Sequence, residues 1–191
     1  METKRKQFQG LTNVIRFNWH FYLFAFCIVL ILFSLSDIFT HPFSILFTIL
    51  AFLTIFTVSI TLVITFYVYD LSNLYKLSWL NNLDFYKNEI IVNINSGFDE
   101  TSELIKKHFR PDTLIVLDFY DEAKHTEISI KRARKAFPPY PKTISVKTVS
   151  IPLETASADK IFCFLSAHEI RSDSERILFL VVGSEQKVML K

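Results

Sequence analysis

Two long apolar runs without a charged side chain constrain this chain more than any other feature. The first extends from Phe17 to Ser36 and the second from Phe43 to Tyr69, and neither contains Asp, Glu, Lys or Arg. A helix rises about 1.5 Å per residue, so a helix over either run is long enough to cross a hydrocarbon core of about 30 Å. Two core helices of a soluble protein are the alternative, but the rest of the chain is too short to cover them. We therefore expect two transmembrane helices, at about 19–38 and 43–69.

The short segment between the two runs predicts an antiparallel hairpin. This segment contains no Lys or Arg, whereas basic residues precede the first run and follow the second: Lys4, Arg5, Lys6, Arg16, Lys76 and Lys87. Since basic residues gather on the cytoplasmic side, we expect a multi-pass protein with both termini in the cytoplasm and residues 1–18 as a cytoplasmic segment. A secretory signal peptide is disfavoured because no small-x-small cleavage site follows the first run.

Residues 70–87 connect the apolar runs to the rest of the chain. Tyr75 and Trp79 are typical of an interfacial segment that leaves the membrane. A plain linker that packs on the following domain explains the same residues equally well, and the sequence leaves both interpretations open.

From residue 88 to residue 191 the sequence becomes that of an α/β domain. Apolar strands are expected at 88–95, 113–118, 143–149 and 159–165, and helices at about 101–109, 122–137 and 172–182. This order of strands and helices predicts a mainly parallel sheet. The expected fold is therefore α/β, with a two-helix transmembrane hairpin followed by a partial Rossmann-like, mainly parallel sheet with flanking helices.

Charge and cysteine content argue against two classes of function. The net charge of the 191 residues is +2, and the basic run Lys131–Lys135 is too short to argue for nucleic acid. That run is most simply a solvated helix face, or alternatively a contact for anionic lipid headgroups. Cys27 and Cys163 lie far apart, which favours two reduced, buried thiols over a disulfide or a metal site. We expect neither a nucleic-acid partner nor a metal.

A glycine turn ends the first expected strand. The apolar run from Ile90 stops at Asn95-Ser96-Gly97-Phe98-Asp99, and a helical pattern follows. In parallel α/β sheets such a turn borders the ligand crevice. The glycine spacing of a dinucleotide fingerprint or of a P-loop is absent. Asp99, Glu100 and Glu103 would repel a polyphosphate, so we expect a neutral or cationic ligand. Helix capping is the alternative, and we favour it for Glu100 and Glu103.

Two further polar sites follow expected strands. Asp118 ends the second strand, where a carboxylate accepts hydrogen bonds from ribose hydroxyls in dinucleotide folds. His168 follows the fourth strand and is either a base or a hydrogen-bonded loop histidine. Glu169 and Arg171 are expected to pair with each other.

The stretch from Ser150 to Ile161, SIPLETASADKI, resembles a signature of class I S-adenosylmethionine-dependent methyltransferases. Ala167-His168 and Ser174–Leu178 look like the segment that follows this signature. Gly-Phe-Asp-Glu-Thr-Ser at 97–102 resembles the loop of a membrane-anchored bacterial subgroup. The resemblance covers about residues 70–182 and implies S-adenosylmethionine as the cofactor. It implies that the cofactor is bound by Asn95, Ser96, Gly97, Asp99, Asp118, Pro152 and Leu153.

The resemblance implies a methyltransferase of the bacterial inner membrane. Because the anchor holds the domain at the lipid bilayer, we expect a lipid or quinone-like acceptor, with His168 and Glu169 as catalytic candidates. The cationic sulfonium and ammonium groups of the cofactor suit an acidic turn, and methyl transfer depends mostly on positioning. The family pattern is not continued by Gly183–Lys191, which predicts a domain that is incomplete at its C-terminus and keeps an exposed sheet edge. A catalytically inactive membrane-tethered interaction module is the alternative.

Overall fold

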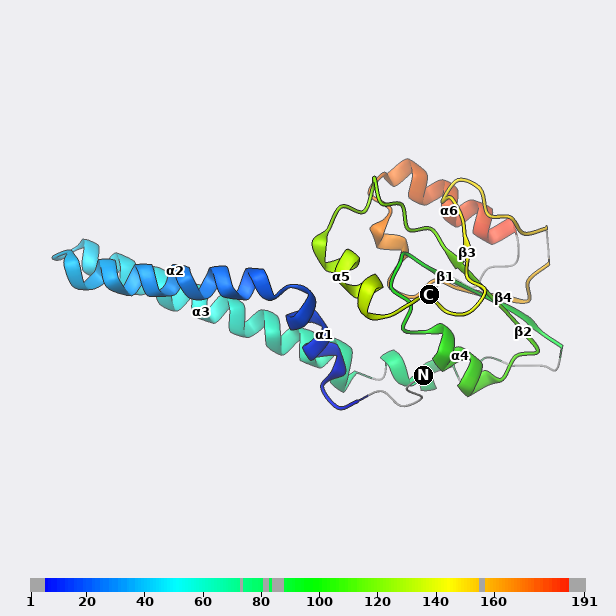
Figure 1. Cartoon of the computed structure of the whole chain (residues 1–191), viewed down its shortest axis with the longest axis horizontal. Coiled ribbons are helices and arrows are strands. Elements are labelled where there is room, and N and C mark those ends of the chain that lie inside the picture. The colour runs from blue at the N-terminus through cyan, green and yellow to red at the C-terminus, as the bar shows by residue number, and fades with distance from the viewer. Residues whose placement is uncertain (1–5, 73, 81–82, 84–87, 155–156, 186–191) are drawn as a thin grey trace. The chain divides into compact units, whose positions relative to one another are not determined.

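The computed structural model divides into two compact units, residues 1–74 and residues 75–191 (Figure 1). It describes residues 6–72, 74–80, 83, 88–154 and 157–185. The first unit is helical, and the second contains a four-stranded parallel sheet with helices. The prediction of a mixed α/β chain with two long apolar helices near its N-terminus is confirmed.

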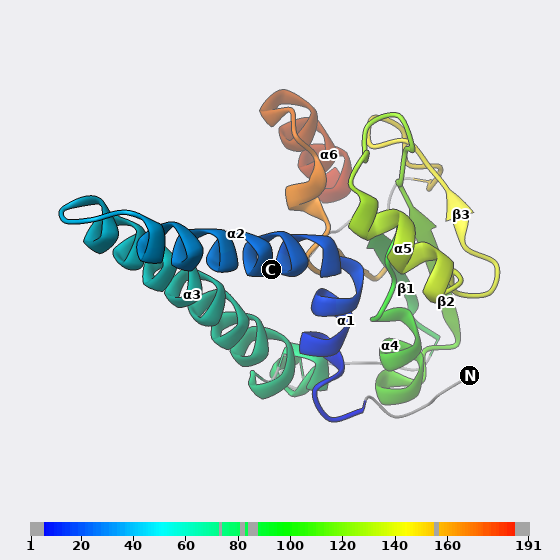
Figure 2. The same cartoon turned by 60° about the vertical axis from the view of Figure 1, so that its left-hand side comes forward.

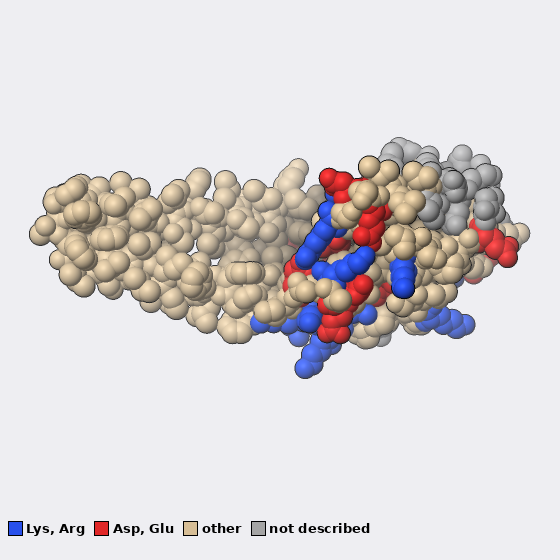
Figure 3. All heavy atoms as spheres, turned by 90° about the horizontal axis from the view of Figure 1, so that it is seen from above, with Lys and Arg blue, Asp and Glu red and all other residues tan. Residues whose placement is uncertain are grey.

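The first unit is built on an antiparallel pair of helices, α2 (Trp19–Ile38) and α3 (Phe43–Phe66), which lie side by side in Figures 1 and 2. Both helices are long and apolar enough to cross a membrane. Ala51 is fully buried where they pack, and the rings of Phe33 and Phe52 meet edge to face at 5.9 Å. Large apolar side chains point outward along both helices, and the face in Figure 3 is free of charged side chains over this hairpin.

Hydroxyl groups join the two helices near the turn of the hairpin. Ser36 Oγ lies 2.7 Å from Thr48 Oγ1, and Ser44 Oγ donates to the carbonyl of Ser36 at 2.8 Å. In an apolar environment each unpaired hydroxyl is costly, so mutual pairing is the stable arrangement. These contacts fix the register of α2 against α3.

A helix absent from our sequence prediction precedes the hairpin. Helix α1 (Gln9–Phe17) lies within the segment expected as 1–18. The carboxylate of Asp70 accepts hydrogen bonds from the backbone N–H groups of Gly10 and Leu11, at 2.9 and 2.8 Å. Asp70 belongs to η1 (Tyr67–Leu71), a π-helical turn that continues α3. The residue that directly follows the second apolar run therefore caps α1.

The sheet of the second unit has the order β3-β2-β1-β4, and every strand pair is parallel. The elements are β1 (Ile90–Asn95), α4 (Ser102–Phe109), β2 (Thr113–Asp118), α5 (Ile128–Ala136), β3 (Ile144–Ser145), β4 (Lys160–Phe162), η4 (Ala167–Glu169) and α6 (Asp173–Glu185). Short 3-10 turns, η2 (Leu74–Lys76) and η3 (Ser78–Leu80), precede them. The prediction of a mainly parallel sheet is confirmed.

The largest differences from the expected bounds concern three shortened elements. The helix predicted at 122–137 begins only at Ile128, because the chain turns at Asp121, whose carbonyl accepts from the N–H groups of Lys124 and His125. The strand predicted at 143–149 is reduced to β3, because Lys147 and Ser150 turn back to pair with each other. The strand predicted at 159–165 ends at Phe162. Helix α6 instead continues beyond 182, to Glu185, and the tail 186–191 lies outside the described residues.

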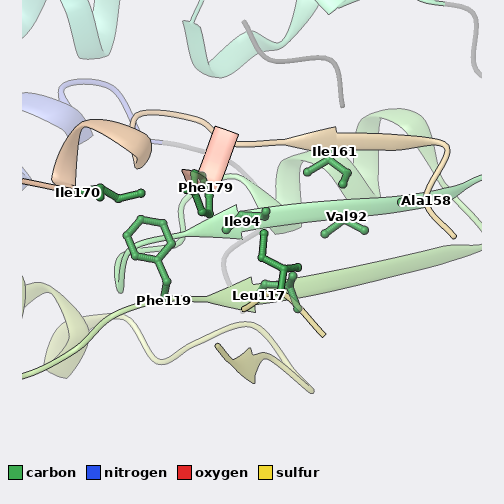
Figure 4. Packing of buried hydrophobic residues seen from close by; sticks show 9 residues of the cluster. Val92, Ile94, Leu117, Phe119, Ala158, Ile161, Ile170 and Phe179 are labelled. Atoms are coloured by element: carbon green, nitrogen blue, oxygen red, sulfur yellow. The ribbon is translucent and has the colours of Figure 1, made fainter. Parts of the chain in front are cut away.

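Apolar side chains cover both faces of the sheet. On one face Val92, Ile94, Leu117 and Ile161 pack with Phe119 and with Phe179 of α6, as Figure 4 shows. The rings of Phe119 and Phe179 are 5.5 Å apart. Continuous apolar strands are typical of a parallel sheet that is covered on both sides.

The second face carries a core that includes residues from the expected linker. Leu77 and Leu80 are buried there with Ile91, Ile105 and Phe162. Residues 70–87, expected as one interfacial linker, are therefore divided, since Asp70 belongs to the first unit and Leu77 to the core of the second. Packing on the following domain is the interpretation that applies to Leu77 and Leu80.

We predict that Leu77→Ala lowers the free energy of unfolding of the α/β unit by about 2–5 kcal/mol, because it removes a side chain that is 1% exposed. Denaturant unfolding of the detergent-solubilised chain, followed by circular dichroism, measures the change. Leu178→Ala is the matched control, since Leu178 is 45% exposed and its truncation should change the stability by less than about 0.5 kcal/mol. Equal effects of the two variants would contradict the placement of Leu77.

Candidate functional site

The carboxyl ends of the strands form the edge at which the polar side chains gather. Register places Asn95 of β1 opposite Asp118 of β2. Strands β2 and β3 extend the sheet on one side of β1, and β4 is added on the other side. In open parallel sheets a crevice opens at such a change of side. Ser166 follows β4 and donates its hydroxyl hydrogen bond to the carbonyl of Ile94 at 2.9 Å. This bond closes the loop after β4 onto the end of β1.

The cysteine beside this loop contacts Ser166. Cys163 Sγ lies 3.0 Å from Ser166 Oγ, and burial raises the pKa of the Cys163 thiol. Both cysteines are free thiols. The expectation that both are buried is wrong for Cys27, which is exposed on α2.

The glycine turn after β1 is held by the side chain of Asn95. Its Oδ1 accepts from the N–H of Gly97 at 3.0 Å, and its Nδ2 donates to the carbonyl of Leu117 at 3.2 Å. Gly97 has a φ of 102°, a conformation that favours glycine. Ser96 is buried between them. The Asn95 amide thus shapes the turn through hydrogen bonds within the protein.

Asp99 caps helix α4. Its Oδ1 accepts from the backbone N–H groups of Thr101 and Ser102, at 3.0 and 2.9 Å. The helix-start N–H groups would otherwise lack partners, which is why a carboxylate here is stabilising. Capping, which we favoured for Glu100 and Glu103, is performed by Asp99. The turn is still acidic. Burial together with the nearby carboxylates of Glu103 and Asp99 raises the pKa of Tyr140.

The carboxylate of Asp118 pairs with an arginine of α5. Arg134 Nη1 donates to Asp118 Oδ2 at 2.6 Å and to the carbonyl of Gly97 at 3.1 Å. Its guanidinium lies over the ring of Tyr120, 4.3 Å from the centroid. The second oxygen of Asp118 accepts from the N–H of Tyr120 at 2.9 Å. Asp118 is buried, at 6% exposed, whereas the Arg134 side chain is 32% exposed, so this is a partly buried ion pair.

Arg134 is a residue of the candidate site that our sequence analysis missed. We read Lys131–Lys135 as a solvated or lipid-facing run, and Arg134 departs from both interpretations because it turns inward. The missed signal is its helical spacing: Ile130, Ala133 and Phe137 recur around it at intervals of three and four, and Ala133 is buried. A charged residue within such a stripe faces the same side as the apolar ones.

A pocket of about 510 Å³ opens at the same edge of the sheet. Its walls include Phe119 and His125 after β2, Val146 and Thr148 after β3, and Ile170 and Glu175 beyond β4. Glu175 ties these segments together, because its Oε1 accepts from Lys124 Nζ at 2.8 Å and from the hydroxyl of Thr148. These two hydrogen bonds lower the pKa of the Glu175 carboxyl below its ordinary value. The volume is in the range of small-molecule sites.

His168 and Glu169 form a solvent-facing pair. Nε2 of His168 lies 3.1 Å from Oε1 of Glu169, and their side chains are 64% and 41% exposed. Glu169 also lines the pocket. The expected pairing of Glu169 with Arg171 is wrong, because Arg171 pairs with Glu127 and Glu169 with His168.

The two remaining candidates lie apart from the pocket walls. Pro152 is exposed, and Leu153 packs against the apolar cluster that contains Ile151 and Ala158. The structure thus joins Asn95, Gly97 and Asp118 through hydrogen bonds and leaves Pro152 and Leu153 outside that group. Over the described ranges, no group of three or more His, Cys, Asp or Glu side chains is arranged to hold a metal ion.

We predict that Asp99→Ala lowers the free energy of unfolding by about 1 kcal/mol, because two N–H groups at the start of α4 lose their acceptor. Asp99→Asn is the matched control, since an asparagine side chain caps a helix about as well. Denaturant unfolding of both variants against the parent measures the difference. If the alanine variant is as stable as the parent, Asp99 is not the cap of α4.

We predict that Glu175 contributes to stability in a pH-dependent way. Its folded pKa is lowered, so its contribution is present above the ordinary glutamate range and is lost as the pH falls through the folded pKa. Glu175→Gln should therefore flatten the acid limb of a plot of unfolding free energy against pH. Glu122→Gln serves as the control, because Glu122 is 77% exposed in its pair with Lys131. A parallel loss of slope in both variants would refute the prediction.

Comparisons with protein-family models, with curated proteins and with solved structures find no match for this chain. The carboxyl edge of the sheet holds the turn at Gly97 and the Asp118–Arg134 pair, beside a pocket whose walls include none of these three residues.

Proposed function

We propose that the chain is a membrane-anchored S-adenosylmethionine-dependent methyltransferase whose α/β unit is a partial Rossmann-like domain. The single observation that carries the proposal is the placement of Asp118 opposite the end of β1, beside the glycine turn. The sheet is parallel, and β2 and β4 lie on opposite sides of β1. In doubly wound sheets an acid and a glycine turn so placed bind the ribose and the adjoining part of a nucleoside ligand.

The residues at the edge fit this ligand if one side chain moves. Gly97 keeps the backbone of the turn open, because a Cβ there would lie 2.8 Å from the ring of Tyr120 and 2.9 Å from Arg134. Asp118 has two carboxylate oxygens for the ribose hydroxyls, but Arg134 donates to Oδ2 and the N–H of Tyr120 donates to Oδ1. The guanidinium is the far end of a flexible side chain, so displacing it needs no change in the sheet. The neighbouring pocket, which begins at Phe119, has room for a purine base.

The residues at this edge would bind the cofactor and remove a proton from the acceptor. S-adenosylmethionine, when bound, supplies a methyl group activated by its sulfonium. Asp118 accepts hydrogen bonds from the ribose, and the turn that Asn95 holds at Gly97 allows close approach of the backbone. His168, with Nε2 3.1 Å from Glu169, is the group that would take a proton from an acceptor hydroxyl. Positioning rather than covalent catalysis supplies most of the rate in this proposal.

The helical hairpin supports the membrane part of the proposal. In this proposal α2 and α3 span the bacterial inner membrane, and both termini are cytoplasmic, because basic residues flank the hairpin while its turn has none. An acceptor that resides in the bilayer, such as a lipid or a quinone-like molecule, follows from the anchor.

A second candidate function is a membrane-tethered interaction module without catalysis. The observation that favours it is the closed state of the site, in which Arg134 satisfies Asp118 and Gly97 together. If this pair never opens, the domain has no ligand site at Asp118 and acts through its surface.

We predict that the detergent-solubilised chain binds S-adenosylmethionine and that Asp118→Ala weakens binding by about tenfold or more, since a charged hydrogen-bond acceptor is lost. Isothermal titration calorimetry measures both dissociation constants. Asp112→Ala is the matched control, because Asp112 is an exposed acid at the opposite end of β2 and is not a wall of the pocket, so its variant should bind like the parent.

The outcomes separate the two candidates. No binding at millimolar ligand would end the methyltransferase proposal. Binding without transfer of a labelled methyl group to any component of a membrane extract would favour the interaction module. Binding that is equal in the parent and in Asp118→Ala would remove the role of Asp118.

A further inference from the structure

The place where a ligand ribose would meet Asp118 is held by a cation of the protein itself. Arg134 makes three contacts that a ligand would have to replace: one to Asp118 Oδ2, one to the carbonyl of Gly97 and one to the face of Tyr120. Its side chain is 32% exposed and is therefore partly shielded from water. A ligand binds at Asp118 only in competition with these contacts.

The displaced guanidinium needs a new anionic partner. A ribose satisfies Asp118 but offers no charge to Arg134, and a shielded cation without a partner is costly. The other charged groups near the turn are the carboxylates of Asp99, Glu100 and Glu103, and Oδ1 of Asp99 is already engaged with the start of α4. A ligand with its own carboxylate or phosphate removes the cost, because arginine pairs bidentately with such groups.

We propose that Arg134 determines ligand specificity by selecting nucleosides that carry an anionic group in addition to their ribose hydroxyls. The ligand exchanges the Asp118–Arg134 pair for two new sets of hydrogen bonds, hydroxyls on Asp118 and an anion on Arg134. A neutral nucleoside replaces only the first set and is therefore disfavoured. This inference rests on the proposed nucleoside site, but it holds for a carboxylate and for a phosphate alike.

The test compares ligands that differ in their anionic group. S-adenosylhomocysteine carries a carboxylate, adenosine 5′-monophosphate carries a phosphate, and 5′-methylthioadenosine carries neither. Calorimetry on the full chain in detergent measures each affinity for the parent, Arg134→Gln, Arg134→Lys and Lys135→Gln. Lys135→Gln is the matched control, since it removes the same charge from an exposed neighbour on α5. Circular dichroism verifies that each variant folds, and Arg134→Lys replaces Arg134→Gln if the latter does not.

We expect the parent to prefer an anionic ligand over 5′-methylthioadenosine by about tenfold or more, as loss of one charged hydrogen-bond partner implies. Arg134→Gln should abolish the preference, Arg134→Lys should reduce it, and Lys135→Gln should retain it. An unchanged preference in Arg134→Gln overturns the inference and leaves the methyltransferase proposal intact. An Arg134-dependent preference for the phosphate with no binding of S-adenosylhomocysteine supports the inference and overturns the proposed cofactor. No binding of any of the three ligands overturns both.

Discussion

The α/β unit depends on the central position of β1. This strand is paired in parallel with β2 on one side and with β4 on the other, and its apolar side chains enter the cores on both faces of the sheet. Its last residue, Asn95, then uses both ends of its amide, one on the glycine turn and one on the end of β2. The geometry of the candidate site is therefore set by the same strand that organises the core, so a disturbance of one reaches the other.

The Asp118–Arg134 pair changes the electrostatic picture of the site. A carboxylate at the end of β2 suggests an acidic surface that attracts hydroxyls or cations, but an internal guanidinium neutralises it. An ion pair with one buried partner contributes little net stability over an apolar pair, while the loss of one partner leaves the other charge uncompensated. We therefore assign the pair a role in the proposed ligand specificity and not in the stability of the fold.

Much of the architecture could be read from the sequence because it follows from apolar patterning. The uncharged runs gave the hairpin, the apolar strands gave a parallel sheet, and the end of β2 fell at Asp118 as expected. The failures concern segments in which local hydrogen bonds override the pattern. The turn at Asp121 delays α5, and the short pairing of Lys147 with Ser150 shortens β3.

The candidate site was predictable only in part. The positions of Gly97 and Asp118 follow from where the strands end, whereas the partner of Asp118 comes from a helix 16 residues later and depends on which way one side chain of a basic run turns. The charge of the run predicted that its side chains face the solvent, whereas the helical spacing of the apolar neighbours predicted that Arg134 faces the interior. Packing against Tyr120 and the carboxylate of Asp118 decided for the interior.

The cap on α1 has a consequence for the order in which the first unit assembles. The N–H groups of Gly10 and Leu11 obtain their acceptor from a residue 60 and 59 positions later in the chain. During synthesis the N-terminal helix is therefore without its cap until the hairpin has been completed through Asp70. Helix α1 therefore receives this cap only after the residues of both long helices have been synthesised.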